Sequence, residues 1–314
     1  MKIVITGALG HIGSRLIREL PGLVPSVDMV LVDNLSAQRY CSLFHLPDQG
    51  HYRFLEEDIL KADLAGIFAG ADAVLHLAAI TNAAGSFEAP EQVEEVNFTG
   101  TERVARACVD AQCPLIFLST TSVYGTQRER VDEGCPETDL NPQSPYAESK
   151  LKAERLLSGL GGSDGLRFVT CRLGTIFGVS PGMRFHTAVN KFCWQALTGQ
   201  PVTVWRTALH QHRPYLDLGD AVAALAFILN RHLYDGQVYN VLTVNATVDD
   251  ILQIISRHVP DLAIRFVDTE IMNQLSYHVS CDRFRGLGFA FQGDLERGIA
   301  ETIGMLKGVR SWKP

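Results

Sequence analysis

The first thirteen residues place a glycine-rich turn between a strand and a helix. Residues 2–6 (KIVIT) form an apolar run of strand length, and residues 6–13 (TGALGHIG) follow with glycines spaced G-x-x-G-x-x-G. A glycine in such a turn permits positive φ, and a residue without a Cβ lets the backbone approach a pyrophosphate, which the amides of the following helix start bind. We therefore expect a dinucleotide-binding loop made by Gly7, Gly10, His11, Ile12 and Gly13.

An acidic residue follows at the spacing that this fold requires. Asp33 ends a second apolar run, residues 29–32, and lies 20 residues after Gly13. A carboxylate there would hydrogen-bond the adenosine ribose and repel the extra phosphate of NADP, so NAD is the expected cofactor. The alternative for Asp33 is a solvated carboxylate after a tight turn. The residues expected near the adenosine are Asn34, Asp58 and Ile59, although Asp58 could equally cap a helix.

Apolar runs of strand length alternate with helical patterns through the first half of the chain. The strand-like runs are residues 2–6, 29–32, 52–55, 73–77, 115–119 and 167–173, and the helical segments include residues 14–20, 90–111 and 146–157. Continuous Val, Ile and Leu strands separated by helices indicate a parallel sheet buried on both faces. We expect an α/β protein whose residues 1–175 form a Rossmann-type, doubly wound parallel sheet that carries the cofactor and the catalytic residues.

This alternation weakens beyond about residue 175. Helical patterns remain at residues 187–198, 220–229 and 247–258, with strand-like pieces at 202–205, 215–218, 238–241 and 264–267. We expect residues 176–314 to form mainly a smaller, mixed lobe that binds the substrate, with the chain able to cross between lobes. The turn-rich stretch 178–183 (GVSPGM) predicts a hinge or a loop over a cleft, and the Gly-rich stretch 158–165 predicts a plain connection.

Composition excludes several classes of partner. The chain of 314 residues has 28 Lys and Arg against 35 Asp and Glu, a net charge of −7, whereas a nucleic-acid surface needs clustered cations. No apolar run approaches the roughly 18 residues of a spanning helix, and the N-terminus is typical of a strand rather than a secretion signal. Seven scattered cysteines without a C-x-x-C pair predict neither a disulfide framework nor a metal site. We expect a cytoplasmic protein that binds neither membrane nor nucleic acid.

Three side chains suited to acid–base chemistry follow the fifth strand-like run. Thr120 comes directly after this run, and Tyr146 and Lys150 lie four residues apart in SPYAESK, residues 144–150. On a helix Tyr146 and Lys150 share a face, and an ammonium beside a phenol lowers the phenol's pKa from about 10. Tyr146 would then be a general base, with Thr120 relaying its proton. A Tyr and a Lys at this spacing also occur by chance, so the hypothesis depends on the dinucleotide loop that precedes them.

These motifs together resemble the extended short-chain dehydrogenase/reductases, in the group of NAD-dependent epimerases and dehydratases of nucleotide sugars. The resemblance covers nearly the whole chain. It is carried by TGALGHIGS at residues 6–14, LVDNLS at 31–36, VLHLAA at 74–79, VNFTGT at 96–101, STTSVYG at 119–125, SPYAESK at 144–150 and LGF at 287–289.

The resemblance implies NAD as cofactor, a nucleotide diphosphate sugar as substrate, and catalysis by Tyr146, Lys150 and Thr120. The residues that it places beside the cofactor include Leu77, Ala78, Ala79 and Asn97. In the family the Asn of this motif supports the active-site helix and its water network, and a buried amide that satisfies the backbone is an equal alternative. Relatives dimerise through helices that correspond to residues 90–111 and 146–157, so a homodimer is expected.

The strand end helps to choose among the family's reactions. Sugar 4,6-dehydratases carry an Asp-Glu pair directly after the catalytic Thr, and decarboxylases often carry a Glu at the second of these positions. This chain has Thr121 and Ser122, which cannot serve as an ionised acid–base pair near pH 7. The remaining set of one base, one relay and one NAD predicts 4-epimerisation through a transient 4-keto sugar. The alternatives are a 4-keto-sugar reductase, a dehydratase, and a sensor that binds NAD without catalysis.

Several polar residues are candidates for binding the substrate. Arg213 resembles the family arginine that clamps the diphosphate, and a guanidinium fork suits phosphate oxygens. The other candidates are Thr81, Thr121, Ser122, Thr175, Arg184 and Asn190, of which Arg184 could equally be a surface charge and Asn190 a polar position on a helix. Thr175 stands where many relatives have Asn, and residues 205–208 (WRTA) replace the usual Gly-Asp-Gly. The nucleotide base and the sugar therefore stay open.

Overall fold

The largest element of the fold is a parallel sheet. A computed structural model describes residues 1–125, 129–268 and 276–309. Seven strands form the sheet in the order β11-β7-β5-β4-β1-β2-β3, and every pair is parallel. Their bounds are β1 (Lys2–Thr6), β2 (Asp28–Asp33), β3 (His51–Glu56), β4 (Ala73–His76), β5 (Leu115–Thr120), β7 (Phe168–Leu173) and β11 (Val238–Val241). The strand order reverses between β1 and β4, so the predicted doubly wound fold is confirmed.

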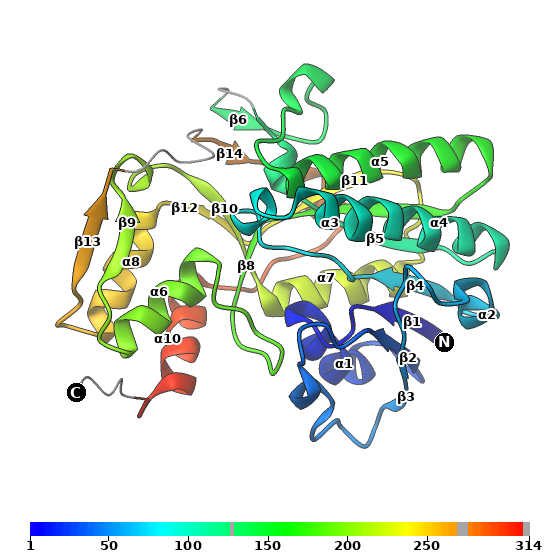
Figure 1. Cartoon of the computed structure of the whole chain (residues 1–314), viewed down its shortest axis with the longest axis horizontal. Helices are drawn as coiled ribbons and strands as arrows, with labels where there is room; N and C mark the ends of the chain where they lie inside the picture. Colours follow the sequence, from blue (N-terminus) through cyan, green and yellow to red (C-terminus); the bar gives the residue numbers. More distant parts are fainter. Residues whose placement is uncertain (126–128, 269–275, 310–314) are drawn as a thin grey trace.

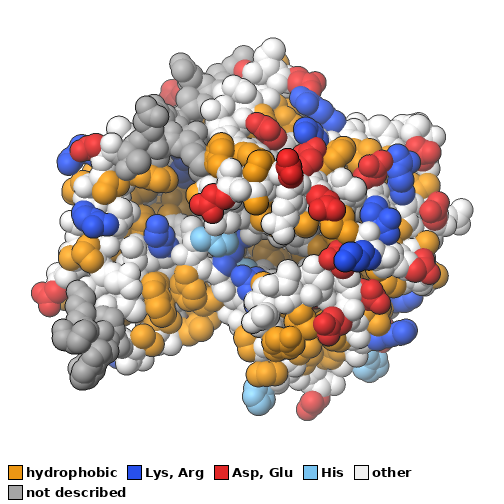
Figure 2. Space-filling model, viewed as in Figure 1, with side chains coloured by type: hydrophobic (Ala, Val, Ile, Leu, Met, Phe, Trp, Pro, Cys, Tyr) orange, Lys and Arg blue, Asp and Glu red, His pale blue; other side chains and the backbone are white. Residues whose placement is uncertain are grey.

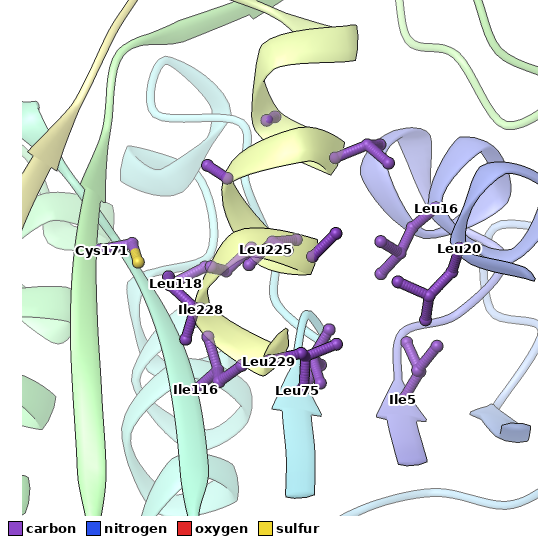
Figure 3. Close-up of a cluster of buried hydrophobic side chains, with 14 of the residues drawn as sticks. Ile5, Leu16, Leu20, Leu75, Ile116, Leu118, Cys171, Leu225, Ile228 and Leu229 are labelled. Atoms are coloured by element: carbon purple, nitrogen blue, oxygen red, sulfur yellow. The ribbon is translucent and has the colours of Figure 1, made fainter. Parts of the chain in front are cut away.

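Helices cover both faces of this sheet (Figure 1). One face packs against α1 (His11–Leu23) and α7 (Leu218–Arg231), and the other against α2 (Leu64–Phe68), α4 (Gly100–Asp110) and α5 (Pro145–Ser163). Successive side chains of β1 divide between the layers, because Ile3 and Ile5 join the α1/α7 core and Val4 joins the other. Figure 3 shows Leu16 and Leu20 of α1 and Leu225 and Leu229 of α7 packed over the sheet. Burial on both faces explains the continuous apolar strands.

Two helical segments differ from their predictions. Residues 90–111, predicted as one helix, form α3 (Pro90–Glu94), a π-helical turn at Glu95–Thr99 and then α4. The stretch 158–165, predicted as a connection, lies mostly in α5, which continues to Ser163. Leu160 is buried in the core beneath this last part of α5, and its packing outweighs the low helix propensity of the neighbouring glycines.

The C-terminal lobe is smaller and mixed, as predicted. Its helices α6 (Ala188–Leu197), α8 (Val248–His258) and α10 (Leu295–Leu306) enclose a core of their own. Beside them lie the three-stranded sheet β12-β10-β8 and the pair β13-β9. The bounds are β8 (Thr175–Phe177), β9 (Val202–Trp205), β10 (Arg213–Asp217), β12 (Val244–Ala246) and β13 (Ile264–Val267). A further strand pair consists of β6 (Arg130–Val131) and β14 (His278–Val279), and α9 is a short helix (Asp282–Gly286).

The chain crosses between the two lobes. Strand β11, from the second half of the sequence, pairs with β7 and is the seventh strand of the large sheet. Helix α7 likewise returns to that sheet, and it begins at Leu218 because the Asp217 side chain caps it by accepting from the Gly219 amide at 2.8 Å. Among the described residues no helix is both long enough and apolar enough to cross a membrane.

Candidate active site

Each glycine of the glycine-rich loop at the end of β1 has a separate structural role. Gly7 has φ +66°, and a Cβ there would lie 2.5 Å from the Ala78 amide nitrogen. A Cβ on Gly13 would lie 2.4 Å from the Ala8 carbonyl oxygen, so this glycine lets the first turn of α1 pack closely on the loop that follows β1. Gly10 lines the cleft described below and puts no side chain into it. These are the three uses of glycine in a pyrophosphate-binding turn, so the loop fits a dinucleotide.

The carboxylate of Asp33 stands beside this loop. It accepts hydrogen bonds from the amides of Leu9 and Leu35, both at 3.0 Å. Asn34 donates to Asp58 at 3.1 Å, and Asp58 also accepts from the Leu60 amide at 2.9 Å. Asp58 therefore closes a turn after β3, and Asp33 keeps lone pairs for a further donor such as a ribose hydroxyl.

A cleft of about 540 Å³ opens where β1, β4 and β5 end, and both lobes line it. Parallel α/β sheets bind their ligands at such a switch point. Figure 2 shows Lys, Arg and His side chains gathered in this hollow. The predicted site residues that line it are Gly7, Gly10, His11, Ile12, Gly13, Leu77, Ala79, Thr81, Thr120, Thr121, Ser122, Tyr146, Lys150, Thr175, Arg184 and Arg213. The predicted residues outside this lining are Asp33, Asn34, Asp58, Ile59, Ala78, Asn97 and Asn190.

Thr120 and Tyr146 meet at the floor of the cleft. Thr120 is the last residue of β5, and Tyr146 lies in the first turn of α5, which Ser144 caps by accepting from the Ala147 amide at 3.2 Å. The two hydroxyl groups are hydrogen-bonded. Burial raises the pKa of Tyr146, while the nearby Arg184 guanidinium and the Thr120 hydroxyl lower it. The sequence had indicated Lys150 as the cation acting on this phenol; the structure adds Arg184, and the role of Lys150 stays a prediction.

Lys150 lies one turn further along α5, in a more enclosed position. Its Nζ lies over the Phe117 ring, 4.7 Å from the ring centre. Burial lowers the pKa of Lys150 to about 7, and the Glu154 carboxylate opposes this decrease. The neighbouring His76 is fully buried between the hydroxyls of Thr6 and Thr101, and burial lowers its pKa to about 3. Lys150 therefore titrates beside a neutral imidazole.

Asn97 lies behind the cleft, in the π-helical turn. It is fully buried, accepts from the Ile80 amide at 2.8 Å, and donates to the Ile80 carbonyl at 2.9 Å and the Ser149 hydroxyl at 3.2 Å. It thereby joins the loop after β4 to α5 between Tyr146 and Lys150. These hydrogen bonds support the helix that carries both residues.

A loop from the second half of the chain covers the glycine-rich loop. We call residues 178–184 the covering loop. His11 bonds through Nε2 to the Gly178 carbonyl at 2.9 Å, and the Gly182 amide donates to the Ser14 hydroxyl at 2.9 Å. Asn190, fully buried, holds both ends of the covering loop: it accepts from the Gly178 amide at 3.3 Å and donates to the Arg184 carbonyl at 3.0 Å. Asn190 thus fixes the loop instead of lining the cleft.

Arg184, at the end of the covering loop, points a cation into the cleft. One of its terminal nitrogens donates to the Thr81 hydroxyl, and its buried Nε has no hydrogen-bond partner among the described residues. Burial lowers its pKa, and Arg39 lowers it further by charge repulsion. Two guanidinium groups brought together in this way form a site for anions.

The sequence reasoning missed Arg39 and Lys191, which also line the cleft. The sequence position of Arg39 could have pointed to it, because it follows Asp33, the carboxylate expected at the ribose, by six residues. At the far end of the cleft the Arg213 guanidinium donates to the Gln211 side chain at 2.9 Å and lies 5.6 Å from the Tyr277 ring centre. No Asp or Glu occurs among the described lining residues, and the described part of the chain contains no cluster of three His, Cys, Asp or Glu side chains placed to hold a metal.

Comparison with known proteins identifies a family, and the names of the relatives include dehydratases, epimerases and a reductase. The family model described as "NAD dependent epimerase/dehydratase family" matches residues 3–241. A trifunctional UDP-glucose 4,6-dehydratase/UDP-4-keto-6-deoxy-D-glucose 3,5-epimerase/UDP-4-keto-L-rhamnose-reductase of Arabidopsis thaliana is 31% identical over 96% of this chain. This chain spans 46% of that protein, and so about half the length of the first curated relatives.

Two relatives of similar size are epimerases by name. An uncharacterised UDP-glucose epimerase of Bacillus subtilis is 30% identical over 77% of this chain and 76% of its own. The structure of the UDP-glucuronic acid 4-epimerase of Bacillus cereus, in complex with UDP-glucuronic acid and NAD, superposes with a TM-score of 0.86 at 25% identity, covering 98% of this chain and 99% of that one.

Proposed function

We propose that this chain, which belongs to the NAD-dependent epimerase/dehydratase family, inverts C4 of a nucleotide diphosphate sugar through a transient 4-keto sugar. The observation that carries the proposal is the strand end above Tyr146. Thr120, Thr121 and Ser122 line the cleft there, and none of these residues carries a carboxylate. Inversion at C4 needs one proton acceptor, one proton relay and one redox cofactor, and these residues provide the first two.

The glycine-rich loop and Asp33 would hold NAD, which would supply the redox chemistry at C4. The chain's own residues manage the proton and the position of the sugar. Tyr146 takes the proton of the C4 hydroxyl and gives it back after the sugar has turned. Thr120, whose hydroxyl is hydrogen-bonded to that of Tyr146, relays this proton and fixes the C4 oxygen of the substrate. Arg184 stabilises the phenolate form of Tyr146.

Dehydration is the main alternative, because several relatives are dehydratases by name. Expelling water needs a group that protonates the leaving hydroxyl and a group that removes a proton from carbon. Thr121 donates its hydroxyl to the Leu173 carbonyl at 3.1 Å, and alcohol side chains do not ionise near pH 7. The positions next to Thr120 therefore favour epimerisation.

Reduction of a 4-keto sugar is the second alternative, and it requires the cofactor to leave after each turnover. The covering loop argues against frequent exchange. It is bonded to the glycine-rich loop through His11 and Ser14, and Asn190 holds it at both ends. An epimerase is redox-neutral and can keep one NAD through many turnovers, so a covered cofactor site suits it.

The substrate-binding residues follow from the same arrangement. We expect Arg213 and Lys191, in the part of the cleft that the C-terminal lobe lines, to bind the diphosphate. We expect Thr175 to contact the diphosphate on the side where the sugar is attached. We also propose a homodimer through the outer faces of α4 and α5, which lie side by side (Figure 1).

Proton NMR of the purified chain with a panel of nucleotide sugars, without added cofactor, tests this function. The panel contains UDP-glucose, UDP-glucuronate, UDP-N-acetylglucosamine and their GDP, dTDP and ADP counterparts. A new H4 signal that approaches equilibrium is the expected result. Accumulation of a 4-keto-6-deoxy product would establish a dehydratase instead, and turnover of a 4-keto sugar only with added NADH would establish a reductase.

A further inference from the structure

A buried carboxylate lies one helical turn beyond Lys150. Glu154 follows Lys150 by four residues on α5, so the two side chains share a face of that helix. Its side chain is only 6% exposed. A buried charge acts on its neighbours through a low dielectric and without screening by salt, so this carboxylate affects Lys150 more strongly than a surface charge would.

The carboxylate is held rigidly from two strands of the large sheet. Arg172 of β7, 5% exposed, donates from its terminal nitrogen to one Glu154 oxygen at 2.6 Å and from Nε to both oxygens at 3.1 Å. The Ser119 hydroxyl of β5 donates to the same carboxylate. The Arg172 guanidinium also lies 5.0 Å from the Tyr124 ring centre, which fixes it on the far side of the pair. Both carboxylate oxygens therefore accept hydrogen bonds from neighbouring strands, which hold the side chain in place.

We propose that Glu154 is a positioning residue that keeps Lys150 protonated in the enclosed site, with Arg172 and Ser119 holding its carboxylate in place. The inference rests on the proposed function only for its effect on turnover. Its effect on the charge of Lys150 does not depend on that function.

Among the described groups that face Lys150, Glu154 is the one that carries a negative charge. Strand β5 presents the Phe117 ring and β4 presents His76, whose imidazole is neutral. Helix α5 contributes Tyr146, which is a neutral phenol until it loses its proton, and Glu154. Of these groups, Glu154 raises the pKa of Lys150 against the lowering effect of burial. Without it, burial would leave the amine uncharged at neutral pH.

NMR titration of Lys150 in the purified full-length chain tests the inference directly. Lysine side chains are labelled at Cε with ¹³C, and the Lys150 signal is assigned by its loss in Lys150→Met. We expect the wild-type signal to titrate near pH 7, as its pKa of about 7 requires. Glu154→Gln should lower the midpoint by about one pH unit or more, since the loss of an opposite charge from a buried site has an effect of that size.

Two further variants separate the charge from the fold. Glu148→Gln removes an exposed carboxylate from the same helix and should leave the Lys150 midpoint unchanged. Glu154→Gln leaves Arg172 buried without its partner, so Glu154→Gln/Arg172→Gln serves where the single variant does not fold. The double variant should shift the midpoint in the same direction by a smaller amount, because it also removes the positive charge of Arg172. A Lys150 midpoint that stays at its wild-type value in folded Glu154→Gln or double-variant protein would overturn the proposal.

The pH dependence of turnover distinguishes this inference from the proposed function. If Lys150 must be protonated for catalysis, the alkaline limb of kcat/KM moves to lower pH in Glu154→Gln together with the NMR midpoint. An NMR shift without movement of this limb would support the role of Glu154 in the charge of Lys150 and contradict the use of that charge in catalysis.

Discussion

Gly182→Ala should loosen the hold of the chain on its cofactor. Gly182 lies in the covering loop and packs directly on the glycine-rich loop. A Cβ at this position would lie 2.3 Å from the Leu9 carbonyl oxygen, 2.7 Å from the Gly10 carbonyl oxygen and 2.8 Å from the Ser14 hydroxyl. Two of these contacts are with backbone that cannot rotate away. The covering loop must therefore lift, or the glycine-rich loop must shift.

The size of the effect follows from the cost of adding one methyl group to a filled site. Such overpacking costs typically about 1–3 kcal/mol. A lifted loop also loses the 2.9 Å hydrogen bond from the Gly182 amide to Ser14, a contribution of about 1 kcal/mol. If the glycine-rich loop bears most of the strain, NAD binds roughly 10- to 100-fold more weakly, because each 1.4 kcal/mol is a factor of ten.

The assay is the NAD content of the purified chain and the rate at which bound NAD exchanges for a labelled one. Gly159→Ala is the matched control, since a Cβ at Gly159 meets no atom within 4 Å and the residue lies inside α5. It should keep wild-type NAD content and gain up to about 1 kcal/mol of helix stability. If Gly182→Ala protein keeps its NAD and exchanges it at the wild-type rate, the covering loop does not retain the cofactor, and the argument against a reductase fails.

Three further substitutions test the site. Tyr146→Phe should reduce kcat by at least about a hundredfold while NAD stays bound, because only the hydroxyl is removed; near wild-type turnover would mean that another group is the base. Asp33→Ala should weaken NAD binding more than substrate binding in calorimetric titrations, and unchanged NAD affinity would separate Asp33 from the ribose. Arg184→Met should raise the pKa of Tyr146, because the Arg184 guanidinium lowers it. The acidic limb of kcat/KM requires the deprotonated phenol and should therefore move by about one unit to higher pH. A limb that stays in place would show that Arg184 does not act on the phenol.

The parts of the site that the sequence predicted are set by local rules. The spacing of Gly7, Gly10 and Gly13 is typical of a turn whose shape depends on a few adjacent residues. Tyr146 and Lys150 are one helical turn apart, and Thr120 ends a strand of the parallel sheet whose position follows from the alternation of strands and helices. Local periodicity thus brings the cofactor loop and the catalytic residues to one edge of the sheet before any long-range contact is known.

The turn-rich stretch 178–183 predicted a loop over a cleft, but the partners of this covering loop could not be found in this way, because its contacts join distant parts of the chain. His11 and Gly178 are 167 residues apart, and Ser14 and Gly182 are 168 apart. No periodicity links such pairs. The same limit applies to β11, which joins the large sheet from the second half of the chain, and to Asn190, whose partners lie 12 and 6 residues before it in an irregular segment.

The electrostatics of the base depend on this distant contact. Tyr146 belongs to the first half of the chain, yet the guanidinium that lowers its pKa comes from Arg184 in the second half. Asn190 holds the carbonyl of Arg184, and Thr81 holds its side chain, so the cation reaches the phenol only when the covering loop is in place. The segment that covers the cofactor site is therefore also the segment that favours the phenolate. If Tyr146 is the base, as proposed, the loop that covers the cofactor site also brings the guanidinium that offsets the effect of burial on its pKa, which suits a reaction in which the oxidised sugar and the reduced cofactor must remain together.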